Sequence, residues 1–289
     1  MDITIVSGLL GAGKTTFIHH NMKHCKGKTV VLVNDFGDAG IDGEVLSSEG
    51  IESVELPSGC ICCTLKDDLI STIKKIQDDF RPDHLIIEPS GIASPSGVLD
   101  TLRAMHIKGE TVVGIVDSSE FPHLYESRMY GPYVEDQIRN SDIILINKID
   151  LAEMHMIEKT ITIIEQMNPE ALLFRTVHSA IDRPMLHVFE KERIIAKDGS
   201  FFSFDTFSLF IPDTRSFDSF NRFFQDVAEG TFGSVVRAKA LVQTDQGPYR
   251  FDLSYGHTGI MPFAGPIAES RVVLIGSHIK KETLKKFFA

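Results

Sequence analysis

Residues 8–16 read GLLGAGKTT, and this stretch decides the fold of the 289-residue chain. It has the form GxxxxGK[ST], follows an apolar run at 3–7 and leads into a helical pattern at 15–25, which is the context that the motif requires. The glycines let the backbone wrap closely around phosphate groups, so that successive N–H groups point at phosphate oxygens. The stretch therefore predicts a phosphate-binding loop between a strand and a helix.

Each residue type in this loop predicts a particular contact. We expect Lys14 to reach the terminal phosphates and the Thr15 hydroxyl to ligate Mg²⁺. The N-terminus of the helix adds partial positive charge beside the phosphates. The nucleotide contacts predicted within the loop are Gly8, Gly11, Ala12, Gly13, Lys14, Thr15 and Thr16.

Short β-branched runs alternate with helical patterns through the first part of the chain. Such alternation predicts an α/β fold, a mostly parallel P-loop sheet with helices on both faces and ligands beyond the carboxyl ends of its strands. The expected strands lie at 3–7, 28–34, 51–56, 84–88, 111–117, 142–147 and 171–176. The expected helices lie at 15–25, 64–80, 95–105, 133–140 and 153–167.

The last 90 or so residues have a different character. They are nearly neutral and hold most of the 20 phenylalanines, whereas all four cysteines precede residue 64. We expect two domains, 1–197 and 200–289, the second a smaller α+β domain with helices on one face of an antiparallel sheet. Its expected elements are strands near 202–211, 234–243, 249–255 and 271–277, a helix carrying Phe217, Phe220 and Phe224, and a short final helix with Leu284, Phe287 and Phe288.

Composition excludes several classes of protein. The chain is 43% hydrophobic and 24% charged, which is ordinary for a globular protein. The net charge of −11 argues against a nucleic-acid partner. The apolar runs are too short to span a membrane, and the start has no secretory pattern, so we expect a cytoplasmic protein without a membrane partner.

The segment Asn147-Lys148-Ile149-Asp150 follows a buried-strand pattern and has the form NKxD. The Asp150 carboxylate can accept from N1–H and the 2-amino group of guanine, a donor pair that adenine lacks. A polar mismatch of this kind gives strong discrimination. With Asn147 and Lys148 bracing the neighbouring loop, the segment predicts a preference for guanine nucleotides and argues against a small-molecule kinase.

Glu88 ends another predicted strand and is followed by Pro-Ser-Gly. In nucleotide hydrolases an acid at this place holds the Mg²⁺ shell, usually through water. We expect Glu88 to do so together with Thr15, and the backbone N–H of Gly91 to approach the γ-phosphate. Lys14, Thr15 and Glu88 are the predicted catalytic residues. A strand-ending acid beside a turn is the structural alternative.

Three thiols, Cys60, Cys62 and Cys63, lie within four residues. Without a sign of secretion a disulfide is disfavoured, and the set can hold Zn²⁺, or else Co²⁺ or Ni²⁺. Three ligands leave one tetrahedral position for water, a neighbour or a partner, which suits transfer of the ion. The alternative is a redox pair or inert cysteines. Asp35 in the preceding acidic loop is either an oxygen ligand or a turn former.

Together these motifs resemble one family, the CobW-like metallochaperone GTPases, which are relatives of the nickel-inserting GTPases for urease and hydrogenase. The tail at 202–288 resembles that family's smaller C-terminal domain. The stretches that carry the resemblance are GLLGAGKTT (8–16), VNDFGDAGID (33–42), ELPSGCICC (55–63), LIIEPSG (85–91), VVGIVD (112–117), QIRNSDIILINKID (137–150) and NPEALLFRT (168–176).

The resemblance implies slow GTP hydrolysis that controls the binding of a transition metal at the three cysteines and its delivery to a client metalloprotein. No glutamine or arginine finger is evident, and GTPases without these groups turn over at roughly 10⁻⁴ to 10⁻² s⁻¹. A client or a second copy of the chain then supplies the group that accelerates hydrolysis. A homodimer is therefore one of the expected alternatives for the oligomeric state. The alternatives are a GTP-dependent metal sensor or buffer, and a redox-regulated GTPase without metal transfer.

Overall fold

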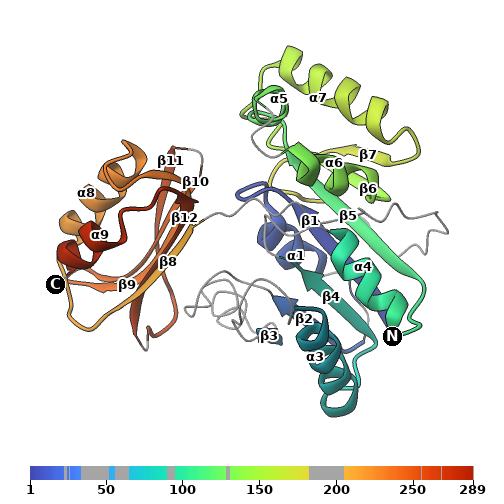
Figure 1. Cartoon of the computed structure of the whole chain (residues 1–289), viewed down its shortest axis with the longest axis horizontal. Coiled ribbons are helices and arrows are strands. Elements are labelled where there is room, and N and C mark those ends of the chain that lie inside the picture. The colour runs from blue at the N-terminus through green and yellow to red at the C-terminus, as the bar shows by residue number, and fades with distance from the viewer. Residues whose placement is uncertain are drawn as a thin grey trace. The chain divides into compact units, whose positions relative to one another are not determined.

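The computed structural model describes residues 1–22, 25, 27–33, 52–55, 65–89, 95–127, 131–181, 205–254, 256–267 and 269–288. These residues form two compact units, which we treat separately (Figure 1). The predicted domain boundary at 197–200 falls between the described ranges and stays a prediction. Across the described ranges, no helix combines the length and the apolar character needed to cross a membrane.

The first unit is built on a seven-stranded sheet in the order β3-β2-β4-β1-β5-β6-β7. Every pairing within it is parallel. Its strands are β1 (Asp2–Gly8), β2 (Thr29–Val33), β3 (Ser53–Glu55), β4 (His84–Glu88), β5 (Glu110–Asp117), β6 (Ile143–Asn147) and β7 (Leu172–Arg175). Strands β2, β4 and β6 are buried throughout, as their unbroken apolar runs predict. The mostly parallel sheet expected from the sequence is confirmed.

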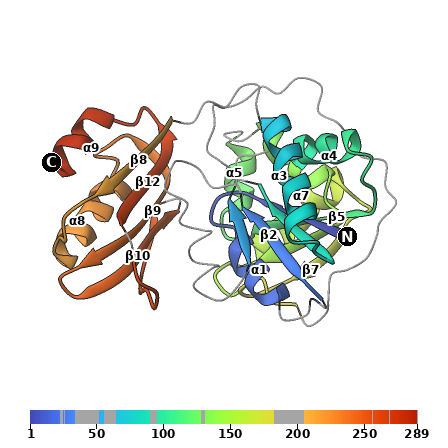
Figure 2. The ribbon, with the colours of Figure 1, turned by 90° about the horizontal axis from the view of Figure 1, so that it is seen from below.

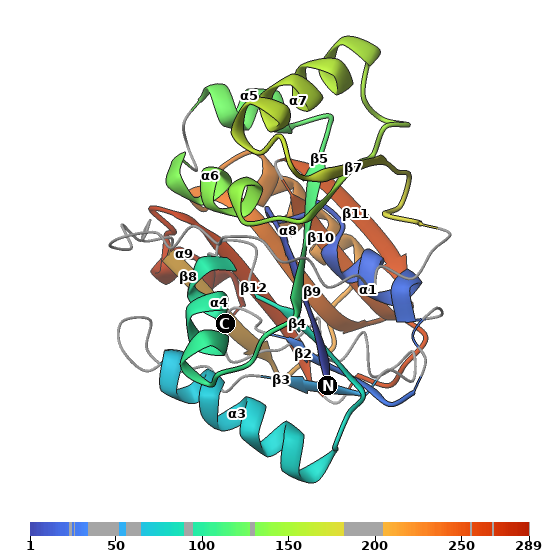
Figure 3. The ribbon, with the colours of Figure 1, turned by 90° about the vertical axis from the view of Figure 1, so that its right-hand side faces the viewer.

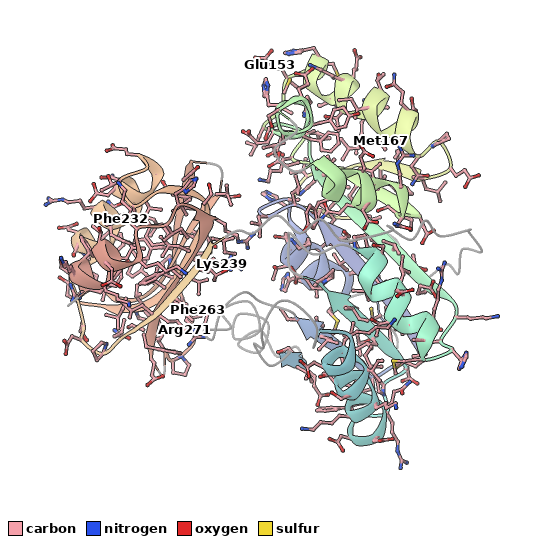
Figure 4. All side chains as sticks on the ribbon, in the orientation of Figure 1. Glu153, Met167, Phe232, Lys239, Phe263 and Arg271 are labelled. Atoms are coloured by element: carbon pink, nitrogen blue, oxygen red, sulfur yellow. The ribbon has the colours of Figure 1, made fainter. Side chains whose placement is uncertain are left out.

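Helices lie on both faces of this sheet. Figure 3 views it nearly edge-on, with α3, α4 and α6 on one side and α1 on the other. On the first side, Ile73 of α3 and Leu99 of α4 pack with Ile5 of β1 in one apolar core. The described helices are α1 (Lys14–Met22), α3 (Leu65–Asp79), α4 (Pro95–Ala104), α5 (Phe121–Glu126), α6 (Gly131–Arg139) and α7 (Met154–Met167). Helix α7 follows its N-cap Glu153 and ends at Met167 (Figure 4).

Two local predictions need correction in this unit. The first helix ends at Met22 rather than at Cys25, since Gly27 soon follows with φ of +86° and directs the chain into β2. Helix α5 was not expected, because its six residues are too few to show helical periodicity.

The second unit is a five-stranded antiparallel sheet in the order β11-β10-β9-β12-β8. Its helices α8 and α9 lie on one side of the sheet (Figure 2), as predicted. The strands are β8 (Asp205–Ile211), β9 (Ser234–Thr244), β10 (Gly247–Ser254), β11 (His257–Pro262) and β12 (Ser270–Ser277), and the helices are α8 (Phe217–Ala228) and α9 (Lys281–Phe288). Strand β11 was missed, because Gly259 and Pro262 weaken its strand pattern.

Phenylalanines fill the core between this sheet and its helices. Phe223 of α8 is fully buried, and its ring lies 5.3 Å from that of Phe232 and 4.9 Å from that of Phe288 between centroids. Ala238, Ala240 and Val242 of β9 point into this core, so alternation places Lys239 on the opposite face (Figure 4). The enrichment in phenylalanine thus builds the core of the second unit.

Candidate nucleotide-binding site

The predicted phosphate loop runs from the end of β1 to the start of α1. Its glycines are required by geometry at two positions. A Cβ on Gly8, whose φ is +151°, would lie 2.4 Å from the Ile115 carbonyl oxygen. A Cβ on Gly13, whose φ is +116°, would lie 2.6 Å from both Asn147 Nδ2 and Ser179 Oγ. The loop is therefore packed against β5, the end of β6 and the segment that follows β7.

Lys14 is the first residue of α1 and is only 6% exposed. Its ammonium donates to the carbonyl oxygens of Gly8 (3.1 Å) and Leu9 (3.3 Å). The lysine side chain thus turns back over the loop instead of extending into solvent. This places its charge beside the backbone that is predicted to hold the phosphates.

Thr15 and Glu88 meet at the carboxyl edge of the sheet. The Thr15 hydroxyl donates to Glu88 Oε1 at 3.3 Å. The two residues come together because β1 and β4 are parallel neighbours, so that the helix following β1 begins beside the end of β4. A hydroxyl and a carboxylate are hard oxygen ligands of the kind that Mg²⁺ prefers, and these residues fit that ion. Thr16 is exposed.

Asn147 joins the NKxD segment to the phosphate loop. Its side-chain amide donates to the Ala12 carbonyl oxygen at 2.8 Å. Its Oδ1 accepts from the backbone N–H of Ser179 at 2.8 Å and from the Thr176 hydroxyl at 3.1 Å. Because Asn147 is only 2% exposed, these hydrogen bonds form away from water. One amide thereby fixes the position of two predicted nucleotide-contacting segments.

Lys148 and Asp150 lie in the turn after β6. Lys148 adopts the left-handed backbone conformation, with φ of +58°, and its ammonium bonds to Asp117 Oδ2 at 2.6 Å. Asp150 is exposed. The turn that carries both residues lies beside the segment after β7, since the Ile149 N–H donates to the Thr176 carbonyl oxygen at 3.4 Å.

Sequence reasoning did not single out Asp117, Thr176 or Ser179. Asp117 is the last residue of β5 and Thr176 directly follows β7, the two strands that flank β6, and Ser179 follows shortly after Thr176. The Ser179 hydroxyl also donates to the Gly13 carbonyl oxygen at 3.1 Å. Polar residues just after neighbouring parallel strands were the available signal, because those strand ends converge on one edge of the sheet.

Several predicted site residues lie outside the described residues. These are Asp35, Cys60, Cys62, Cys63 and Gly91. Within the ranges that the structure describes, no three His, Cys, Asp or Glu residues gather closely enough to hold a metal ion. The predicted metal site therefore stays a prediction.

Cys25 lies between α1 and β2, apart in sequence from the three clustered cysteines. Its Sγ lies 3.5 Å from Nδ1 of His84, the first residue of β4, and burial raises the pKa of the thiol. Burial also lowers the pKa of His84, an effect partly opposed by Asp2, while its Nε2 lies 2.9 Å from the Thr4 hydroxyl. These contacts occur at the start of β4, whereas the Thr15–Glu88 contact is at its end.

A parallel sheet, a glycine loop held against neighbouring strand ends, and a hydroxyl–carboxylate pair define a P-loop nucleotide-binding protein. The family can be stated as well. The chain belongs to the CobW/HypB/UreG family, because residues 2–175 match the nucleotide-binding domain of that family. Residues 204–289 match the C-terminal domain of the cobalamin synthesis protein cobW.

Several similar proteins have zinc in their names. The zinc chaperone CobW of a Sinorhizobium species is 36% identical over 181 residues, which are 52% of this chain and 51% of that protein. The zinc-regulated GTPase metalloprotein activator 1 of Dictyostelium discoideum is 29% identical over 221 residues, 63% of this chain and 46% of that protein. The chain thus spans about half the length of these relatives.

Other relatives align along the whole chain. The zinc chaperone YjiA of Escherichia coli is 24% identical over 311 residues, covering 99% of this chain and 97% of that protein. The crystal structure of Zn(II)-bound YjiA GTPase from E. coli has a TM-score of 0.47 and 19% sequence identity, and the match covers 100% of this chain and 98% of that one.

Proposed function

We propose that this chain binds GTP, hydrolyses it slowly, and uses the bound nucleotide to control a transition metal that it delivers to a client metalloprotein. Zinc is the proposed cargo, since the names of several relatives specify zinc, and Co²⁺ and Ni²⁺ are the alternatives. Cys60, Cys62 and Cys63 are the proposed metal ligands. The observation that carries the proposal is the direct connection of the phosphate loop to the NKxD turn through Asn147.

The geometry around Asn147 supports guanine as the base. An NKxD sequence has little meaning by itself, because Asn and Asp are common in turns. Here its asparagine bonds to the phosphate loop, so the exposed Asp150 follows on a turn that is fixed relative to Lys14 and Gly13. A carboxylate in that position can pair with the N1–H and 2-amino donors of guanine, and would lack those partners with adenine.

Hydrolysis is proposed to rest on electrostatic stabilisation. The Lys14 ammonium and the backbone N–H groups of the loop stabilise negative charge on the phosphoryl oxygens. Thr15 and Glu88 are the residues that would hold Mg²⁺, Thr15 directly and Glu88 through water. When bound, that ion supplies further charge stabilisation. In this scheme the chain alone hydrolyses GTP slowly, because it only positions these charges around the phosphates. A group added by a client or a second copy of the chain raises the rate of hydrolysis.

The packing of α3 against α4 supports coupling between nucleotide and metal. The segment 56–64, which carries the three cysteines, leads directly into α3, and the segment 90–94 after Glu88 leads directly into α4. The two helices share an apolar core, and the Lys66 ammonium of α3 bonds to Asp100 Oδ2 of α4 at 3.0 Å. A shift at the start of one helix is therefore resisted by the other, and linkage makes any such effect reciprocal.

Zinc affinity measured in two nucleotide states tests the proposal. The protein is titrated with zinc against a competing chelator, once with GDP and once with a non-hydrolysable GTP analogue, both with Mg²⁺. We expect the two zinc affinities to differ about fivefold or more, which is the lower range of allosteric coupling. The triple change of Cys60, Cys62 and Cys63 to Ser should abolish the tight site. Cys25→Ser is the matched control and should leave zinc binding intact.

The outcomes separate the alternatives. Equal zinc affinities in the two states would refute nucleotide control. A nucleotide-dependent affinity without release to any apo-metalloprotein would indicate a sensor or buffer. Absence of zinc binding in anaerobically purified protein, together with reversible oxidation of the three thiols, would indicate a redox-regulated GTPase.

A further inference from the structure

The carboxylate of Asp117 is held by three donors at the end of β5. Its Oδ2 accepts from the Lys148 ammonium at 2.6 Å, and its Oδ1 accepts from the Ser119 N–H at 3.0 Å and the Ser119 hydroxyl at 2.6 Å. The Asp117 side chain is 9% exposed and that of Lys148 is 30% exposed. The ion pair is thus largely shielded from solvent, and the carboxylate cannot rotate away without losing its contacts with Ser119.

The same turn also holds the backbone of the NKxD segment. Both the backbone N–H and the hydroxyl of Ser118 donate to the Asn147 carbonyl oxygen, at 3.0 and 2.8 Å. Asp117 and Asn147 are direct neighbours in the parallel register of β5 and β6. Ser118 therefore holds the peptide group that precedes Lys148, and Asp117 holds the Lys148 ammonium. Such fixation removes side-chain freedom before any ligand binds.

The Lys148–Asp117 ion pair matters for Asp150, the residue that is predicted to bind the base. Asp150 lies two residues after Lys148 in the same turn, and it is exposed. In the described part of the chain no hydrogen bond or ion pair joins the two residues, and the ammonium is bonded to Asp117 instead. An ammonium left without Asp117 would be drawn to the Asp150 carboxylate, where it would compete with the N–H donors of a base.

We infer that Asp117 is a specificity-determining positioning residue, which holds the Lys148 ammonium away from Asp150 so that the Asp150 carboxylate stays open to the donors of guanine. The inference rests on the proposed guanine-nucleotide function. It assigns Asp117 no contact with the nucleotide.

Binding of GDP and of inosine diphosphate to Asp117→Asn tests this role. Inosine diphosphate lacks the 2-amino group, so the ratio of the two affinities reports on what Asp150 contributes. We expect Asp117→Asn to weaken GDP binding about 10- to 100-fold, as for loss of a charged hydrogen bond. The preference for GDP over inosine diphosphate should fall about 3- to 10-fold. Adding Lys148→Met should restore that preference, because it removes the competing ammonium.

Controls separate this role from a structural one. Thermal unfolding shows whether Asp117→Asn is folded, and Glu126→Gln, which breaks the Lys159–Glu126 ion pair between α5 and α7, should leave both affinities unchanged. If Asp117→Asn weakens both nucleotides equally, or if Lys148→Met fails to restore the preference, the inference is wrong. If the unmodified protein itself does not prefer GDP, the proposed guanine function fails instead.

Discussion

Replacing Asn147 by alanine separates the two structural tasks of this side chain. The change deletes an amide that bonds Ala12, Thr176 and Ser179, whose exposed fractions are 1%, 5% and 0%. A buried polar group left without a partner costs about 1–3 kcal/mol. Water entering the space left by the amide offsets part of this cost, so we expect a loss of about 3 kcal/mol in the free energy of unfolding.

Asn168 provides a matched control for this experiment. It is also buried, and its amide donates to the carbonyl oxygens of Ile138 (2.7 Å) and Ser141 (2.8 Å), away from the phosphate loop. Asn168→Ala removes these two donated bonds and should therefore lose about 2 kcal/mol of stability. Nucleotide affinity should respond differently, because only Asn147 contacts the loop.

The assay combines urea unfolding followed by circular dichroism with titration of a fluorescent GDP analogue. We expect Asn147→Ala to weaken GDP binding about 10- to 100-fold, equivalent to about 1.4–2.8 kcal/mol, and Asn168→Ala to change it less than about twofold. The reasoning is refuted if Asn147→Ala binds GDP as tightly as the unmodified protein. It is also refuted if Asn168→Ala loses affinity to the same extent, since the loss would then reflect stability alone.

Three further predictions concern glycine, histidine and phenylalanine positions. Gly13→Ala should lower the free energy of unfolding by about 2–4 kcal/mol, because the new methyl group meets a positive φ and two close contacts. Gly97→Ala in α4, whose Cβ would meet nothing within 4 Å, should raise it slightly. Thermal unfolding measures both changes. The pKa of His84 lies below its ordinary value of 6.5, so the unfolded chain binds more protons below that pH and stability falls on acidification. His84→Gln should flatten this loss in urea titrations below pH 6.5, and equal slopes would contradict the reasoning. Phe223→Ala should cost about 3–5 kcal/mol in the second unit, and a loss under about 1 kcal/mol by calorimetry would show that this core tolerates the cavity.

The sequence predicted those parts of the fold that depend on local patterns. Strands β2 and β4 are unbroken apolar runs, and the glycine loop carries its own spacing, so both were located to within about two residues. Helix α5 was not predicted, because six residues are too few to show a helical period. Strand β11 was not predicted, because its composition is a weak strand signal and its extended form depends on pairing with β10.

The sequence predicted which types of residue form the site. It did not predict the hydrogen bonds between residues that are far apart in the chain. Lys14 and Thr15 belong to a contiguous motif. The bond from Asn147 to Ala12, in contrast, spans 135 positions, and it exists only because β1 and β6 flank β5 in the same sheet. Asp117 ends the stretch VVGIVD, but its pairing with Lys148 depends on a strand register that spacing does not encode.

The place of each strand in the sheet also sets how often its backbone opens to solvent. Strand β1, which ends in the phosphate loop, is paired on both sides, whereas β3, which precedes the cysteine segment, has three residues and, among the residues that the structure describes, pairs with β2 alone. Edge strands fray at far lower free energy than central ones. Amide hydrogens of β3 should then exchange with deuterium well before those of β1, and an ion captured just beyond β3 would slow that exchange.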